Sequence, residues 1–292
     1  MNYFVSLWAK MDYTINVHGR LMDLGEPQVM GILNVTPDSF YAGSRKQTEQ
    51  EIADCANQII SEGGTIIDVG AFSTRPGAAE VSEVEEMARL RFALGIVRRE
   101  LPYAVLSVDT FRPDVARMAV EEYGADMIND VSEGGLTGIV NTPLDQTDEV
   151  YPAMFRMVAQ LRVPYILMSV QPTLREMLLG FSKKVQQLRD LGVKDIILDP
   201  GFGFGKTLEQ NYQLMNELEK LSVMELPLLV GISRKSMIYK LLGFTAEESL
   251  NGTTILNTIA LMKGASILRV HDVKEALECV RIVKSLNGQI VK

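Results

Sequence analysis

VMGILNV, at residues 29–35, is an apolar run that carries a polar side chain able to do chemistry, Asn34. Runs of this kind recur along the chain at intervals of roughly 20–40 residues, with helix-like segments between them. This rhythm predicts a (β/α)8 TIM barrel, in which the active site lies at the carboxyl ends of the strands. The polar residues in or after the later runs are Asp68, Asp109, Asn129, Asp130, Ser169, Asp199, Ser233, Arg234, Lys235, Arg269 and His271.

The composition is that of a soluble globular enzyme. The chain has 292 residues, of which 47% are hydrophobic and 23% are charged, and this length suits one barrel. The formal net charge is −8 and no long basic cluster occurs, so nucleic acid and membrane surfaces are poor candidates for partners. An anionic substrate would need cations that are concentrated locally at the strand ends.

The cysteines and the N-terminal sequence indicate the cellular compartment of the protein. Cys55 and Cys279 lie far apart in helix-like segments and lack the spacing of metal ligands, which predicts a reduced, cytoplasmic protein without a disulfide framework. The N-terminus makes a poor signal peptide, and no apolar run reaches the roughly 18 residues of a membrane span.

The chain reads as one domain over residues 1–292. Residues 13–24 alternate around His18-Gly19, which predicts a β-hairpin within an N-terminal extension, residues 1–27, placed to close the bottom of the barrel. Ser82 and Thr173 begin capping-box patterns at the starts of predicted helices, and Pro113 suits a first helical turn.

Two loops are candidates for ligand contact. The segment from Asn34 to Phe40 (NVTPDSF) follows a buried strand, and its length and aromatic residues favour a mobile lid over an ordinary βα loop. Arg75, in STRPG at residues 73–77, suits an anion or a carboxylate, although a solvated surface arginine fits that segment equally well.

The segment DPGFGFGK, at residues 199–206, resembles two phosphate-binding motifs and matches neither. Its glycines allow backbone to approach a flat ligand closely. Asp199 could accept two parallel N–H bonds from a ring such as an aminopyrimidinone, or it could simply cap the turn before Pro200.

The two last strand ends are rich in cations. GISRKS, at residues 231–236, and Arg269 with His271 occupy the recurrent phosphate site of this fold, which favours a phosphate-bearing substrate over a charged rim. The chain has no HExxH motif, no GxSxG motif and no Cys/His ligand cluster. A metal would therefore be Mg²⁺, held by oxygen ligands and phosphate, rather than Zn²⁺.

Together, MGILNVTPDSF (30–40), STRPG (73–77), SVDT (107–110), INDVS (128–132), DPGFGFGK (199–206), GISRKS (231–236) and LRVHDV (268–273) resemble the dihydropteroate synthase family, in order and at nearly every strand end. The resemblance implies a (β/α)8 barrel that forms a homodimer. It also implies an Mg²⁺-dependent transferase of folate biosynthesis that joins 6-hydroxymethyl-7,8-dihydropterin diphosphate to 4-aminobenzoate, releases diphosphate and is a target of sulfonamides.

The resemblance also assigns roles to residues, with Asp109, Lys235 and Asn34 expected to be catalytic and Asn34 also to contact the metal. The expected pterin-binding residues are Asp109, Asn129, Met168, Asp199, Gly203, Lys235 and Arg269. The expected diphosphate-binding residues are Asn34, Thr74, Arg269 and His271. The expected aminobenzoate-binding residues are Phe40, Thr74, Arg75, Pro76, Phe204, Lys235 and Ser236.

The chemistry implied is a dissociative displacement at the pterin methylene. Cations and Mg²⁺ stabilise the departing diphosphate, and Asp109 is the anion expected to stabilise the cationic pterin left behind. The amine loses its proton late, so no dedicated general base is needed. We expect loops 34–46 and 72–80 to close over the site and exclude water.

The chain departs from the family at three places. Ala42 stands where the first loop usually carries an acid that helps to hold Mg²⁺, Ala71-Phe72 replaces Gly-Glu, and Ser169 to Pro172 replace the usual residues after Met168. Two alternatives therefore stay open. One is a barrel that transfers a methyl group from methyltetrahydrofolate to a corrinoid protein, and the other is a pterin-binding paralogue with impaired catalysis.

Overall fold

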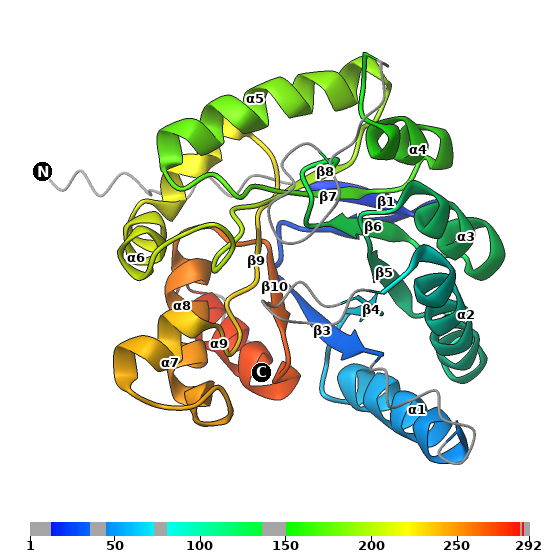
Figure 1. The fold of residues 1–292 in the computed structure, drawn as a ribbon. Coiled ribbons are helices and arrows are strands. Elements are labelled where there is room, and N and C mark those ends of the chain that lie inside the picture. The colour runs from blue at the N-terminus through cyan, green and yellow to red at the C-terminus, as the bar shows by residue number, and fades with distance from the viewer. Residues whose placement is uncertain (1–12, 36–44, 73–80, 136–149, 287, 289–292) are drawn as a thin grey trace, which may run out of the picture.

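The computed structural model describes residues 13–35, 45–72, 81–135, 150–286 and 288. Within these residues, parallel strands form a ring surrounded by helices, which confirms the predicted (β/α)8 barrel (Figure 1). The sheet order is β8-β7-β6-β5-β4-β3-β10-β9, and a bridge between Leu198 and Leu228 links its two ends. The strands are β3 (Gln28–Asn34), β4 (Ile66–Gly70), β5 (Val105–Asp109), β6 (Met127–Asp130), β7 (Tyr165–Met168), β8 (Ile196–Asp199), β9 (Leu229–Val230) and β10 (Ile267–Val270).

The helices follow their strands and start where the sequence signals lie. Ser82 Oγ accepts a hydrogen bond from Glu85 N at 3.2 Å, Thr173 Oγ1 accepts one from Glu176 N at 3.3 Å, and Pro113 opens its helix, as predicted. The helices are α1 (Arg45–Ser61), α2 (Glu83–Glu100), α3 (Pro113–Tyr123), α4 (Ala153–Leu161), α5 (Leu174–Asp190), α6 (Leu208–Asn216), α7 (Ser236–Leu242), α8 (Leu250–Met262) and α9 (Val273–Leu286). None of the described helices is long and apolar enough to cross a membrane.

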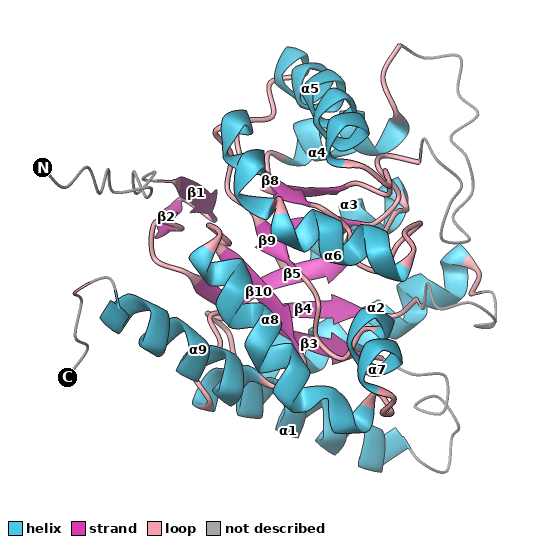
Figure 2. Cartoon of the chain, turned by 90° about the vertical axis from the view of Figure 1, so that its left-hand side faces the viewer, coloured by secondary structure: helices cyan, strands magenta, loops and turns pink. Residues whose placement is uncertain are grey.

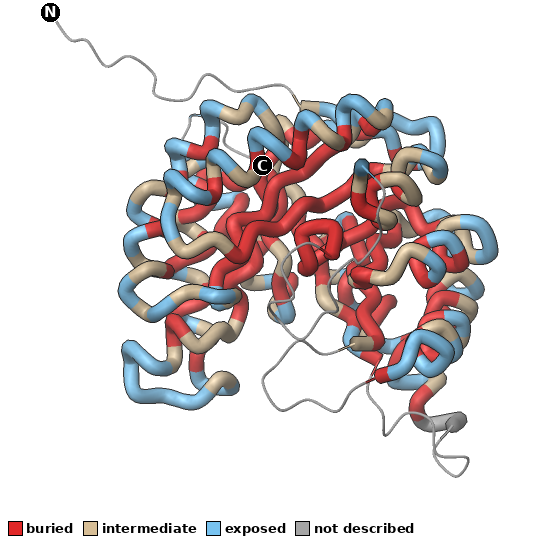
Figure 3. The backbone as a smooth tube through the Cα atoms, turned by 45° about the horizontal axis from the view of Figure 1, so that its top comes forward, coloured by how far each residue is buried: buried red, intermediate tan, exposed pale blue. Residues whose placement is uncertain are grey.

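Side chains alternate along each strand between two packing environments. One set of side chains packs outward against the helices, as Ile67 and Val69 of β4 do. Most residues of the barrel strands are buried (Figure 3). The other set points inward and forms an apolar layer at the amino ends of the strands. That layer consists of Met30, Ile66, Met127, Ile166, Ile197, Leu229 and Ile267.

The predicted hairpin is present and covers this layer, at the end of the barrel from which the strands start (Figure 2). Strands β1 (Thr14–Val17) and β2 (Arg20–Asp23) pair antiparallel, and the two residues between them both have positive φ: 48° at His18 and 77° at Gly19. Ile15, Val17 and Leu24 pack on the layer. The hairpin therefore closes the bottom of the barrel, as predicted. The burial of each of these side chains contributes at most about 1.5–3 kcal/mol to stability.

Candidate active site

The inward face changes from apolar to polar two residues further along most strands. Ile66 is followed on this face by Asp68, and Ile267 is followed by Arg269, because side chains of a strand repeat their direction every second residue. The same step occurs on neighbouring strands, so the polar residues gather at the carboxyl end of the barrel. The other inward residues at this level are the polar Ser107, Asn129 and Asp199 and the apolar Ile32, Met168 and Gly231.

Arg269 lies at the centre of this polar region. Its Nε atom donates to Asp68 Oδ2 at 2.6 Å and its Nη2 atom donates to Asp109 Oδ2 at 2.9 Å. Burial raises the pKa of Asp109 to about 7; the positive charge of Arg269 opposes the shift, while the charges of Asp68 and Glu86 add to it. A further cation beside Asp109 would favour its charged form.

Asp68 and Asn129 present hydrogen-bond acceptors inside the barrel. Asn129 Nδ2 donates to Asp68 Oδ2 at 3.1 Å, and both side chains are buried. Asp68 Oδ1 and Asn129 Oδ1 are buried and have no hydrogen-bond partner among the described residues, which suits N–H groups of a ligand ring. Asp68 received no role from the sequence motifs, although its place in an apolar run marked it as a candidate.

Asp199 caps the turn after β8, which is one of the two roles that the sequence suggested for it. Its Oδ1 atom accepts a hydrogen bond from Gly201 N at 2.7 Å. Burial raises the pKa of this carboxyl, and the charge of Lys235 opposes the rise. Oδ1 keeps a second lone pair and Oδ2 keeps both, so capping does not prevent recognition of a ring.

The glycine loop, residues 200–205, depends on left-handed backbone. Its glycines have φ of 64° at Gly201, 81° at Gly203 and 62° at Gly205. A Cβ on Gly201 would lie 2.2 Å from Ser169 O, so another residue there would collide with the backbone after β7. Gly201 is therefore required by the packing of the loop against the segment after β7.

Lys235 faces the glycine loop from the start of α7. Its ammonium donates to Phe202 O and lies 4.4 Å from the centroid of the Phe204 ring. Burial lowers the pKa of Lys235 to about 8, and the negative charge of Asp199 opposes the shift.

Met168 and Val170 form a small apolar cluster with Val131, and Phe204 packs against it, which provides a surface for a flat ring.

The cations after β9 and β10 have different roles. Arg234 forms a two-point ion pair with Asp272, at 2.9 Å and 2.5 Å, so the charge of this predicted phosphate-site cation is compensated within the protein. His271 Nδ1 and Ser233 Oγ lie 3.0 Å apart, and Ser233 Oγ also accepts His271 N. Ser236 begins α7 beside Lys235. Within the described residues, Lys235, Arg269 and His271 are the other basic side chains at these two strand ends, and Arg269 is itself paired with Asp68 and Asp109.

Asn34 and Asp109 converge on the end of β4 because Gly70 leaves room there. Asn34 Oδ1 and Asp109 Oδ2 lie 3.6 Å and 3.7 Å from the point that a Cβ on Gly70 would occupy. Both are oxygen ligands of the kind that Mg²⁺ prefers. No cluster of three or more His, Cys, Asp or Glu residues among the described part of the chain could hold a metal. The oxygens of Asn34 and Asp109 fit a metal that would take its other ligands from phosphate and water.

Several sequence-predicted residues lie outside the described residues: Phe40, Ala42, Thr74, Arg75 and Pro76. Most of loops 34–46 and 72–80 lies there too, so their closure stays a prediction. The described ends of the second loop are held by arginines that the motifs did not reveal. Arg89 donates to Ala71 O at 3.2 Å, and Arg112 donates to Val81 O at 2.6 Å.

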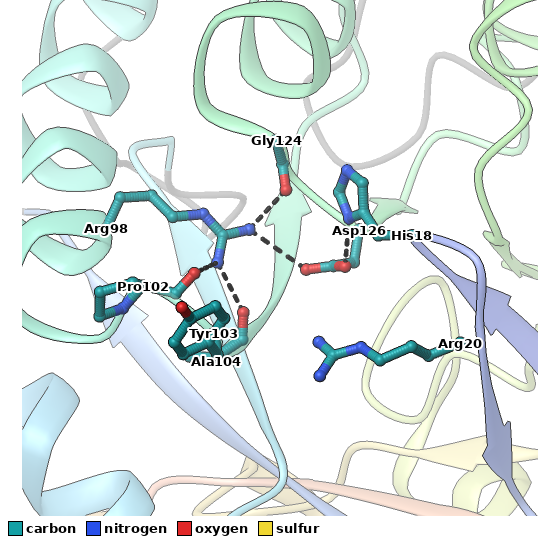
Figure 4. A pocket seen from close by; sticks show the side chains of 8 residues that line it. All are labelled: His18, Arg20, Arg98, Pro102, Tyr103, Ala104, Gly124 and Asp126. Carbon is teal, nitrogen blue, oxygen red and sulfur yellow. Dashed lines mark hydrogen bonds and ion pairs between the residues drawn. The ribbon is translucent and has the colours of Figure 1, made fainter.

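A separate cavity of about 510 Å³ lies at the other end of the barrel, beside the hairpin turn. Figure 4 shows His18 and Arg98 on either side of Asp126, with the guanidinium of Arg20 directed toward them. His18 Nδ1 lies 2.5 Å from Asp126 Oδ1, and Arg98 Nη2 lies 3.2 Å from Asp126 Oδ2. None of the sequence-predicted site residues lines this cavity, so it is distinct from the strand-end site.

Comparisons with known proteins agree with this geometry. Residues 30–271 match the family described as pterin binding enzyme. The dihydropteroate synthase of Escherichia coli K12 is 39% identical over 269 residues, which cover 91% of this chain and 94% of that protein.

Two solved structures are similar over almost their whole length. Dihydropteroate synthase from Xanthomonas albilineans with 4-aminobenzoic acid has a TM-score of 0.83 and 32% identity, covering 95% of this chain and 99% of that one. The Yersinia pestis enzyme with a sulfonamide drug complex has a TM-score of 0.81 and 37% identity, covering 94% and 100%. The chain therefore belongs to the dihydropteroate synthase family of pterin-binding enzymes.

Proposed function

We propose that the strand-end site condenses 6-hydroxymethyl-7,8-dihydropterin diphosphate with 4-aminobenzoate to give 7,8-dihydropteroate and diphosphate. The observation that carries this proposal is the arrangement around Arg269, which bridges Asp68 and Asp109 and has Lys235 and Asp199 close by. The site offers carboxylates for ring N–H groups, cations for a leaving diphosphate and an apolar wall for a flat ring. Related enzymes with 4-aminobenzoic acid and with a sulfonamide support the choice of second substrate.

The residues divide the work of this reaction. Asp199 and Asn129 orient the pterin ring, and Arg269 and His271 face the diphosphate. As the bond from the methylene carbon to the diphosphate oxygen breaks, positive charge develops on the pterin. Asp109 stabilises that charge, because its carboxylate form is favoured by a neighbouring cation. The amine then attacks the methylene carbon and releases its proton afterwards, so no side chain needs to act as a dedicated base.

Mg²⁺ is the metal that we propose for this site. When bound, it would neutralise charge on the diphosphate and so assist its departure. Asn34 Oδ1 would be its protein ligand, with phosphate oxygens and water completing the coordination. The position of Asn34 Oδ1 beside Gly70, where the Asp109 carboxylate also lies, supports this assignment.

Ala42 allows the metal proposal to be tested. Relatives of this chain usually carry an acid at this place, so we expect the natural enzyme to be active with a raised Mg²⁺ requirement. Ala42→Asp should lower the Mg²⁺ concentration that gives half the maximal rate, and should strengthen Mg²⁺ binding in calorimetry with diphosphate present. Identical midpoints in both proteins would show that position 42 does not reach the metal. Activity that appears only in Ala42→Asp would favour the impaired paralogue.

Lys235 predicts a pH dependence. Its pKa of about 8 means that the ammonium predominates below pH 8 and is lost above it. We therefore expect kcat/KM for the pterin substrate, which reports on the free enzyme, to fall as pH rises through about 8. Lys235→Met should lower turnover at neutral pH by at least about tenfold, ~1.4 kcal/mol, and should lack this fall in its profile. Steady-state rates across this range test both points, and a near wild-type rate in the variant would contradict the assignment.

A homodimer is a further part of the proposal. Helices α7, α8 and α9 and the segment after α7 expose apolar side chains, and α8 packs against both α7 and α9. A second copy of the chain would remove these groups from water. Light scattering of the wild type and of Phe244→Glu tests this, with a monomer expected for the variant only. The exposed residues are Leu241, Leu242, Phe244, Ile255, Met262, Ile282 and Leu286.

A diphosphate-release assay, with and without 4-aminobenzoate, separates the function from its alternatives. Release that depends on both substrates is the result we expect. A methyltransferase or an impaired paralogue would bind pterin without that dependence.

We also propose that the chain acts as one domain over residues 1–292 and that it is cytoplasmic. The free thiols of Cys55 and Cys279 support a reducing compartment.

A further inference from the structure

Lys206, the last residue of DPGFGFGK, has no role in the mechanism above. Its ammonium donates three hydrogen bonds to backbone carbonyls: to Ser169 O at 3.1 Å, to Gly201 O at 3.0 Å and to Phe204 O at 3.1 Å. An ammonium has three donors, so all of them are used inside the protein. Burial lowers the pKa of Lys206 to about 8, which shows that this charge is held at a cost in solvation.

These three bonds join two strand ends. Ser169 follows β7, whereas Gly201 and Phe204 belong to the glycine loop after β8. The loop contains three glycines with positive φ, so its backbone has many accessible conformations. A second tie, from Gly203 N to Asn211 Oδ1 at 2.7 Å, connects the loop to α6. Lys206 therefore ties both Gly201 and Phe204 to the strand end beside the loop, in addition to the backbone bond from Phe204 N to Gly201 O at 3.1 Å.

The held loop in turn places groups that the reaction uses. The ring of Phe204 lies 4.4 Å from Lys235 Nζ, and Phe202 O accepts a hydrogen bond from the same ammonium. Phe204 also packs against the cluster of Val131, Met168 and Val170. A shift of Phe204 O away from Lys206 would move this ring. Asp199 would stay close to its position, because it accepts its own hydrogen bond from Gly201 N.

We propose that Lys206 is a positioning residue that fixes the Phe204 ring through the backbone of the glycine loop and thereby governs affinity for the aromatic amine. This inference rests on the proposed function, because it takes 4-aminobenzoate as the second substrate. Lys206 would then affect the affinity for 4-aminobenzoate and not the affinity for the pterin. A residue that only stabilised the fold would weaken the binding of both substrates together.

The first test is Lys206→Met, which keeps the length of the side chain and removes its donors. Calorimetry with 4-aminobenzoate, in the presence of diphosphate and a pterin, should show an affinity about tenfold weaker, ~1.4 kcal/mol. The affinity for the pterin alone should stay within about twofold. Lys263→Met is the matched control, because Lys263 also donates to a backbone carbonyl, Asn216 O at 2.8 Å, away from the strand-end site. Both affinities should be unchanged in that control.

The second test asks whether Lys206 acts through Phe204. In a Phe204→Leu background, Lys206→Met should have little further effect on 4-aminobenzoate affinity, because the ring it positions is gone. Additive losses, an equal loss of pterin affinity, or no loss at all would each overturn the proposal. These readouts measure binding and need no turnover. A wild type that binds both molecules but releases no diphosphate would therefore refute the proposed function and leave this test valid.

Discussion

Replacing Arg269 with methionine is expected to reduce kcat/KM by at least about 100-fold, which is ~2.7 kcal/mol of lost transition-state stabilisation. The guanidinium is expected to serve two functions that methionine cannot. It is a cation at the place where the diphosphate is expected to leave, and it holds Asp109 through the 2.9 Å bond to Oδ2. The loss should appear mainly in kcat, because charge on the leaving group and on the pterin is greatest in the transition state.

The same substitution should also destabilise the fold, because it leaves Asp68 and Asp109 without their shared counter-charge. Asp68 is fully buried, so we expect a loss of about 2–3 kcal/mol in the free energy of unfolding. A double variant, Asp68→Asn with Arg269→Met, should recover much of that stability and none of the activity. Denaturant unfolding and steady-state kinetics on both variants separate the two effects. Wild-type kcat in Arg269→Met would refute its role at the diphosphate.

The barrel could be predicted from the sequence because its signal is repeated. VMGILNV and the later apolar runs each contain or precede a polar residue, and one irregular run does not disturb a rhythm shared by the others. The hairpin was predictable for a local reason, since His18-Gly19 supplies two residues that tolerate positive φ between alternating strands. The short strand β9, Leu229–Val230, carries only two residues in regular geometry, and it was found through its place in the repeat.

The site was less predictable, because strand-end position alone does not give the direction of a side chain or its partner. Arg234 and Lys235 are adjacent in GISRKS, yet Arg234 pairs with Asp272 while Lys235 faces the glycine loop. Arg269 faces two carboxylates from strands more than a hundred residues away, Asp68 and Asp109. Such pairings follow from the inward register of neighbouring strands, which motifs in one dimension do not record.

Asp199 allows a test that distinguishes ring recognition from turn capping. Asp199→Asn keeps an oxygen that can accept Gly201 N, so the cap at 2.7 Å can survive in the variant. The other position of the side chain becomes an NH₂ group, which donates where a pterin ring needs an acceptor. We therefore expect thermal stability close to that of the wild type and a loss of about 1.5–3 kcal/mol in pterin affinity, the scale of a charge-assisted hydrogen bond.

Titration calorimetry with a pterin analogue measures this loss, and Asp199→Ala is the matched comparison because it removes the cap as well as the acceptor. If Asp199 only caps the turn, Asp199→Asn should bind pterin normally, and Asp199→Ala should lose stability with affinity following it. If Asp199 recognises the ring, both variants should lose affinity while Asp199→Ala alone loses stability as well. The position of the carboxylate beside Lys235, whose charge opposes the rise in its pKa, favours the second outcome, since that charge helps to keep Asp199 ionised for the ring.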